Sequence, residues 1–148
     1  MTHTHALRVL IVDDEPGDAH LMELALKKSG FPLDLSFAND GLDALVGLGH
    51  QNDRSPGLPR PDLILLDLKM PGKGGLETLR AIKQSEHLRA IPVVVVTTSA
   101  LAADLAAAYR YGAAGYVLKP VGLDEFVAAV QTLATYWFGL VRLPKRAE

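Results

Sequence analysis

The sequence predicts an α/β fold, a doubly wound five-stranded parallel sheet with helices on both faces. Short apolar runs alternate along the chain with segments of helical periodicity, five times in all. Polar residues follow most of these runs abruptly, as expected where buried parallel strands end at the edge of a sheet. Right-handed crossovers between successive parallel strands place helices on both faces, so serial strand–helix units imply this architecture.

The first unit begins with the apolar run 7–12 (LRVLIV), which ends in the acidic residues Asp13, Asp14 and Glu15. Pro16 is suited to the first turn of a helix, and apolar residues then recur at helical spacing until Gly30. The acidic residues are therefore expected at the carboxyl end of a buried strand.

The second unit combines an alternating strand at 33–38, a turn at 39–41 and a short helix at 42–48. Residues 49–61 (GHQNDRSPGLPRP) contain three prolines and several polar residues, which predicts a surface loop longer than most connections of this kind. We interpret this loop as an insertion and not as a domain boundary.

In each of the remaining three units, the strand is followed by a residue with a charged or hydroxyl side chain. The strands are expected at 62–66, 91–96 and 115–118, ending on Asp67, on Thr97 and on Lys119. Helices follow: one carrying Leu76, Leu79 and Ile82, one at 100–111, and a long one from 123 to about 141.

Composition excludes several classes of protein. The chain has 148 residues, 49% of them hydrophobic and 22% charged, which is typical of one folded domain. A net charge of -2 with scattered basic residues argues against nucleic-acid binding. Cysteine is absent, there is no secretory signal, and every apolar run is far shorter than the roughly 20 residues that span a bilayer, so we expect a cytoplasmic protein.

Ligands of doubly wound sheets bind outside the carboxyl ends of the strands, so the polar strand-end residues should converge there. Mg²⁺ is usually held by one or two carboxylates, which Asp14 and Asp67 could supply at this edge.

The motifs DDE, DLKMPGKGG, TTS and GYVLKP follow the first, third, fourth and fifth strands in the order and spacing that resemble a response-regulator receiver domain (CheY-like). The resemblance covers about residues 7–135. It implies a flavodoxin-like sheet of strand order 2-1-3-4-5 and phosphorylation of Asp67 by a histidine kinase. It also implies a signalling switch, not an enzyme, with self-catalysed phosphotransfer and slow autodephosphorylation.

The resemblance assigns the metal ligands. Asp14 and Asp67 would bind Mg²⁺ directly, Asp13 largely through water, and Lys69 through its backbone carbonyl.

It also assigns the residues that respond to phosphorylation. Thr97 and Lys119 would contact the phosphoryl oxygens, and Tyr116 would rotate inwards as the switch residue.

The C-terminal segment TYWFGLVRLPKRAE departs from the usual receiver pattern, in which the last helix ends sooner. An aromatic run so near the terminus must be buried against its own domain or against another chain. Together with the inserted loop, it resembles small regulators paired with phytochrome-type histidine kinases. We therefore expect residues 1–6 to form a flexible tail, 7–135 a receiver domain, and 136–148 an extension that, with the last helix, makes a homodimer contact.

The sequence disfavours three alternative classes of protein. A phosphorylation-independent pseudo-receiver would lack a key residue, whereas all are present. A haloacid dehalogenase-type phosphohydrolase would carry its nucleophile in an Asp-x-Asp pair after the first strand, where this chain has DDE. A flavodoxin-type cofactor binder needs a hydroxyl- and glycine-rich phosphate loop at that position, where acidic residues would repel phosphate.

Overall fold

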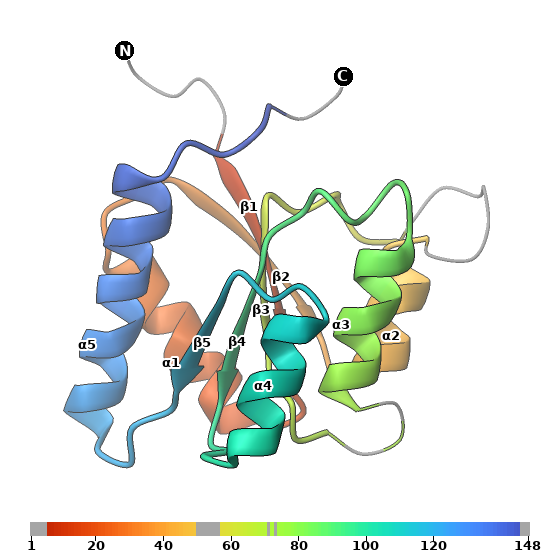
Figure 1. The fold of residues 1–148 in the computed structure, drawn as a ribbon. Helices are drawn as coiled ribbons and strands as arrows, with labels where there is room; N and C mark the ends of the chain where they lie inside the picture. The colour runs from red at the N-terminus through yellow and green to blue at the C-terminus, as the bar shows by residue number, and fades with distance from the viewer. Residues whose placement is uncertain (1–5, 50–56, 71, 73, 146–148) are drawn as a thin grey trace.

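The computed structural model describes residues 6–49, 57–70, 72 and 74–145, and it confirms the predicted fold (Figure 1). The five strands are all parallel and follow the order β2-β1-β3-β4-β5. They are β1 (Leu7–Val12), β2 (Leu33–Ala38), β3 (Leu63–Leu66), β4 (Val93–Thr97) and β5 (Gly115–Leu118). The α-helices are α1 (Pro16–Lys27), α2 (Gly41–Gly47), α3 (Gly75–Gln84), α4 (Ala102–Arg110) and α5 (Leu123–Ala134).

Two helical layers cover the sheet, α1 and α5 on one face and α2, α3 and α4 on the other (Figure 1). Side chains alternate between the two faces, so Val9 and Ile11 pack toward α1 and α5 while Leu10 and Val12 pack toward the other layer. All four are at most 1% exposed. Burial on both faces explains why the central strands read as continuous apolar runs.

Most element boundaries agree with the sequence prediction, and the differences have local causes. Strands β1, β2 and β5 match it residue for residue. Strand β4 begins at Val93, two residues later than expected, because Pro92 has no N–H to donate to a neighbouring strand. Of the predicted loop 49–61, residues 57–61 form no helix or strand, and residues 50–56 lie outside the described residues.

The last helix is predicted to run from 123 to about 141, and it changes character on the way. Helix α5 ends at Ala134, and the π-helical segment η1 (Thr135–Leu140) continues it. Phe138 in η1 is 6% exposed and meets the ring of Phe31 edge to face, with ring centroids 5.9 Å apart. Tyr136 and Leu140 are 51% and 71% exposed, so the aromatic run is divided between core and surface.

Within the described part of the chain, no helix has the length and apolar character needed to cross a membrane.

The position of Phe138 yields a stability prediction. Phe138→Ala should lower the free energy of unfolding by about 3 kcal/mol, because it leaves a cavity beneath Phe31. The exposed neighbour Leu140 provides the control, and Leu140→Ala should change stability by less than about 0.5 kcal/mol. Urea denaturation of the three proteins measures both effects, and equal losses would show that Phe138 is not part of the core.

Candidate functional site

The site lies at the carboxyl edge of the sheet, where strand pairing brings distant residues together. Asp13 follows β1 and Asp67 follows β3, and these neighbouring strands are paired in register through Val12 and Leu66. The Asp67 amide donates to the Val12 carbonyl oxygen at 3.0 Å, which extends the ladder to Asp67 itself. The pairing therefore sets two carboxylates side by side.

Three carboxylates form a cluster at this edge. One oxygen from each of Asp13, Asp14 and Asp67 lies within 4.8 Å of the others. Asp13 and Asp67 are buried, at 4% and 6% exposure, while Asp14 is exposed to solvent. Like charges at this spacing repel, and a divalent cation with oxygen ligands relieves that repulsion. The donor set therefore fits a divalent metal ion.

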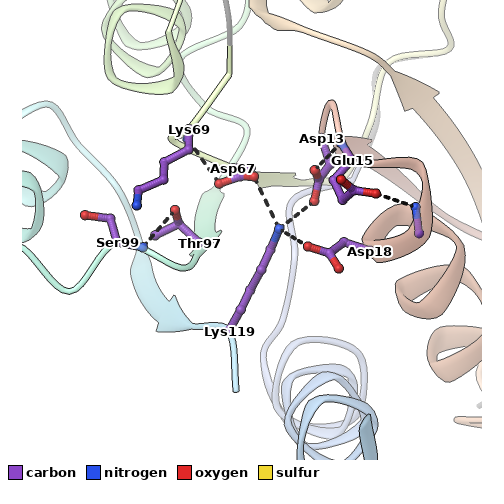
Figure 2. Close-up of polar contacts among 9 residues, drawn as sticks. Asp13, Glu15, Asp18, Asp67, Lys69, Thr97, Ser99 and Lys119 are labelled. Carbon is purple, nitrogen blue, oxygen red and sulfur yellow. Dashed lines mark hydrogen bonds and ion pairs between the residues drawn. The ribbon is translucent and has the colours of Figure 1, made fainter. Parts of the chain in front are cut away.

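Lys119 is the counter-ion of this cluster (Figure 2). Its ammonium lies 2.8 Å from Asp13 Oδ2, 2.9 Å from Asp18 Oδ2 and 3.2 Å from Asp67 Oδ2. Burial alone would lower the pKa of Lys119, but the hydrogen bonds to Asp13 and Asp18 outweigh it, so the pKa is raised above its ordinary value. The lysine is therefore fully charged at neutral pH.

The balance of charge also affects Asp13. Burial raises the pKa of the Asp13 carboxyl above its usual value, although the hydrogen bonds from Lys119 and from the Glu15 amide oppose that rise. One ammonium facing three carboxylates leaves an excess of negative charge, so added positive charge should be favourable here.

The carboxylate of Asp67 is held at both of its oxygens. The Lys69 amide donates to Oδ1 at 3.2 Å, and Lys119 donates to Oδ2. Behind it, Gly75 begins α3 so close that a Cβ there would lie 2.3 Å from the Asp67 carbonyl oxygen. The glycine is required because α3 packs directly on the backbone at Asp67.

Thr97 and Tyr116 both contact Ser99, in the segment between β4 and α4. Thr97 is fully buried, and its Oγ1 accepts a hydrogen bond from the Ser99 amide at 3.3 Å. The Tyr116 hydroxyl donates to the Ser99 carbonyl oxygen at 2.9 Å. The Ser99 hydroxyl donates in turn to Asp104, in the first turn of α4. This segment therefore links the site to α4 and β5.

The structure brings together four of the predicted site residues, Asp13, Asp14, Asp67 and Lys119. Thr97 is the last residue of β4, at the same edge. Tyr116 is connected to this edge by its hydrogen bond to the Ser99 carbonyl oxygen. Lys69 is exposed to solvent.

Sequence reasoning missed two residues of the site. Asp18 binds Lys119 from the first turn of α1, and Ser99 is the shared partner of Thr97 and Tyr116. Asp18 follows Asp14 by one helical turn, but an acidic residue at that position is equally typical of an ordinary helix N-terminus. Ser99 completes the TTS motif, which was the available signal.

The fold and the residues at this edge define the class of protein. The chain belongs to the response regulator receiver domain family, whose family model matches residues 9–131. It is thus a receiver-type signalling protein of the two-component class.

Comparison with individual proteins points to phytochrome-associated regulators. Response regulator Rcp1 from Synechocystis sp. (strain ATCC 27184 / PCC 6803 / Kazusa) is 39% identical over 136 residues, 92% of each chain. The crystal structure of Mn²⁺-bound Rcp1 superposes with a TM-score of 0.87 at 38% identity, covering 94% of this chain and 99% of that one. The crystal structure of the phosphorylated cyanobacterial phytochrome response regulator RcpA superposes with a TM-score of 0.89 at 33% identity, covering 95% of this chain and 100% of that one.

The crowding of carboxylates yields a prediction about metal-linked stability. In metal-free buffer, Asp14→Asn should raise the free energy of unfolding by about 0.5–1 kcal/mol, because it removes repulsion from Asp13 and Asp67. Added Mg²⁺ should raise the melting temperature of the native chain and have much less effect on the variant.

Thermal unfolding followed by circular dichroism, with and without EDTA, measures both effects. The matched control is Asp34→Asn, an equal loss of charge at an exposed position of β2. If Mg²⁺ stabilised all three proteins equally, the cluster would not be the metal site.

Proposed function

We propose that this chain is the response regulator of a two-component phosphorelay and accepts a phosphoryl group on Asp67 from a phosphohistidine of its kinase. One observation carries the proposal. The buried Asp67 carboxylate lies in a cluster with buried Asp13 and exposed Asp14, and a buried lysine donates to it at 3.2 Å. Such an arrangement combines a nucleophile, a cation site and a fixed positive charge, which phosphoryl transfer requires.

In the proposed reaction, a carboxylate oxygen of Asp67 attacks phosphorus while the bond from phosphorus to the donor nitrogen breaks, and an acyl phosphate forms. Asp13, Asp14, Asp67 and the Lys69 carbonyl would hold Mg²⁺, with Asp13 acting largely through water. The ion would neutralise charge on the transferring oxygens. The related response regulator Rcp1 has been solved in a Mn²⁺-bound form, which supports the proposal of a divalent ion for this chain.

The residues around Asp67 would then respond to the new charge. Lys119 is placed to donate to a phosphoryl oxygen, and the Thr97 hydroxyl would donate to another on exchanging its contact with the Ser99 amide. Because Tyr116 binds the carbonyl of that same Ser99, a shift of the segment would alter the Tyr116 contact and the adjoining surface of α4 and β5. Phosphorylation would in this way change affinity for a partner, and hydrolysis of the acyl phosphate would reset it.

The kinase partner is proposed to be of the phytochrome type. RcpA is described as a phytochrome response regulator, and a further neighbour, at 37% identity and a TM-score of 0.70, is a bacteriophytochrome response regulator. Such a kinase draws on cytoplasmic ATP, so the cytoplasm is the proposed compartment. The pseudo-receiver alternative is not favoured because Asp67, Lys119 and Thr97 are all in place at one edge of the sheet.

Mass spectrometry tests the proposed acceptor. After incubation with acetyl phosphate and Mg²⁺, the native chain should gain one labile adduct of about 80 Da, and Asp67→Asn should gain none. Asp62→Asn is not a suitable control, because its carboxylate accepts from the Arg8 amide, so the exposed Asp34→Asn serves instead. An adduct that survived Asp67→Asn would assign phosphorylation to another residue.

We further propose that the protein is a homodimer through α5 and the extension 136–148, without direct contact with nucleic acid. Tyr136 and Leu140 lie on the outer side of η1, and Tyr136 stacks edge to face on Trp137 with ring centroids 5.5 Å apart. Exposed apolar side chains of this kind, on a segment that continues α5, are typical of a protein interface.

The dimer is tested without disturbing the core. Deleting the extension would also remove Phe138, which packs on Phe31, so we use the double variant Tyr136→Ser/Leu140→Ser. Sedimentation velocity should show a dimer for the native chain and a monomer for the variant, with unfolding free energies that differ by less than about 1 kcal/mol. Equal sedimentation coefficients would place the interface elsewhere or show that there is none.

A further inference from the structure

Asp18 is an unexpected partner of the phosphoryl-accepting site. Its carboxylate lies on the first turn of α1 and accepts a hydrogen bond from the Lys119 ammonium at 2.9 Å, across 101 residues of sequence. The Asp18 side chain is 35% exposed, whereas that of Lys119 is 4% exposed. Asp18 thus lies between the buried Lys119 ammonium and the solvent.

The three partners of Lys119 are not equivalent. Asp13 and Asp67 belong to the carboxylate cluster that fits a divalent cation, and Asp18, among the described residues, does not. An ammonium has three hydrogens to donate, and here one oxygen from each of three carboxylates lies within hydrogen-bond distance of its nitrogen. A cation bound at the cluster draws on the charge of Asp13 and Asp67 and repels the ammonium. Asp18 then provides the uncommitted negative charge that Lys119 needs.

The start of α1 explains why Asp18 points to the site. Glu15 caps the helix by accepting from the Gly17 amide, and Pro16 occupies the first turn. The helix therefore begins directly after the acidic residues of β1, and side chains in its first turn tilt back toward that end. Asp18 and Lys119 are also among the residues that line a cavity of about 380 Å³.

We propose that Asp18 is a positioning residue for phosphoryl transfer, holding the Lys119 ammonium beside Asp67 when a divalent cation occupies the cluster. This inference rests on the proposed function and extends it to a residue outside the metal site. Lysine has a long flexible side chain, so an anchor on the solvent side keeps its ammonium in place for the arriving phosphoryl oxygen. Asp18 acts through Lys119 and needs no contact with the phosphoryl group.

The first experiment does not depend on phosphorylation. NMR of ¹⁵N-labelled lysine ammonium groups should show a slowly exchanging Lys119 signal in the native chain, both without and with saturating Mg²⁺, identified by its absence in Lys119→Met. Asp18→Ala should lose this signal when Mg²⁺ is added, Asp18→Glu should regain it, and the charge-matched control Asp34→Ala should keep it. A signal that persists in Mg²⁺-loaded Asp18→Ala would overturn the proposal.

The second experiment measures the rate of phosphorylation by acetyl phosphate at saturating Mg²⁺. Asp18→Ala should be slower than the native chain by about threefold to tenfold, with the Asp34→Ala rate unchanged. In the Lys119→Met background the same substitution should have no further effect, because Asp18 acts through that lysine. An equal loss in both backgrounds would overturn the positioning role. Absence of any adduct on the native chain would contradict the proposed function, and the NMR result would still decide the role of Asp18.

Discussion

The contact between one buried lysine and three carboxylates is the constraint on which the rest of the site depends. Lys119 is 7% exposed, and a buried ammonium is costly unless negative charges surround it. Asp13, Asp18 and Asp67 supply those charges from two strand ends and a helix. The carboxylates in turn tolerate close approach because the lysine lies among them. Neither set of charges would be stable at this edge without the other.

The parallel sheet makes this arrangement possible. Its central strands are buried on both faces and leave their carboxyl ends at one edge, so residues that follow β1, β3, β4 and β5 meet there. The apolar layers keep the edge rigid, and Gly75 lets α3 pack against the backbone of Asp67. A rigid scaffold with an excess of negative charge at one point favours a divalent cation and, through it, a phosphoryl group.

Signal output would depend on the segment that follows β4 at the same edge. The Ser99 amide donates a hydrogen bond to Thr97, and the Ser99 carbonyl accepts one from Tyr116. The Ser99 hydroxyl donates to Asp104 of α4. One short segment therefore joins the residue that would contact the phosphoryl group to the surface that would contact a partner. The coupling needs no long pathway, because all of these contacts lie within a few residues of the end of β4.

The sequence by itself determined the alternation of strands and helices and the identity of the residues at the strand ends, because burial and periodicity are local properties of the chain. Asp13, Asp14, Asp67, Thr97 and Lys119 were all predicted at one sheet edge from their places after apolar runs. The tertiary structure alone decided which acidic residues surround Lys119, with Asp18 among them, and which aromatic residue of the C-terminal run enters the core. These outcomes depend on packing between α1, α5 and the sheet. Residues a hundred positions apart meet there, and a local pattern carries no information about that distance.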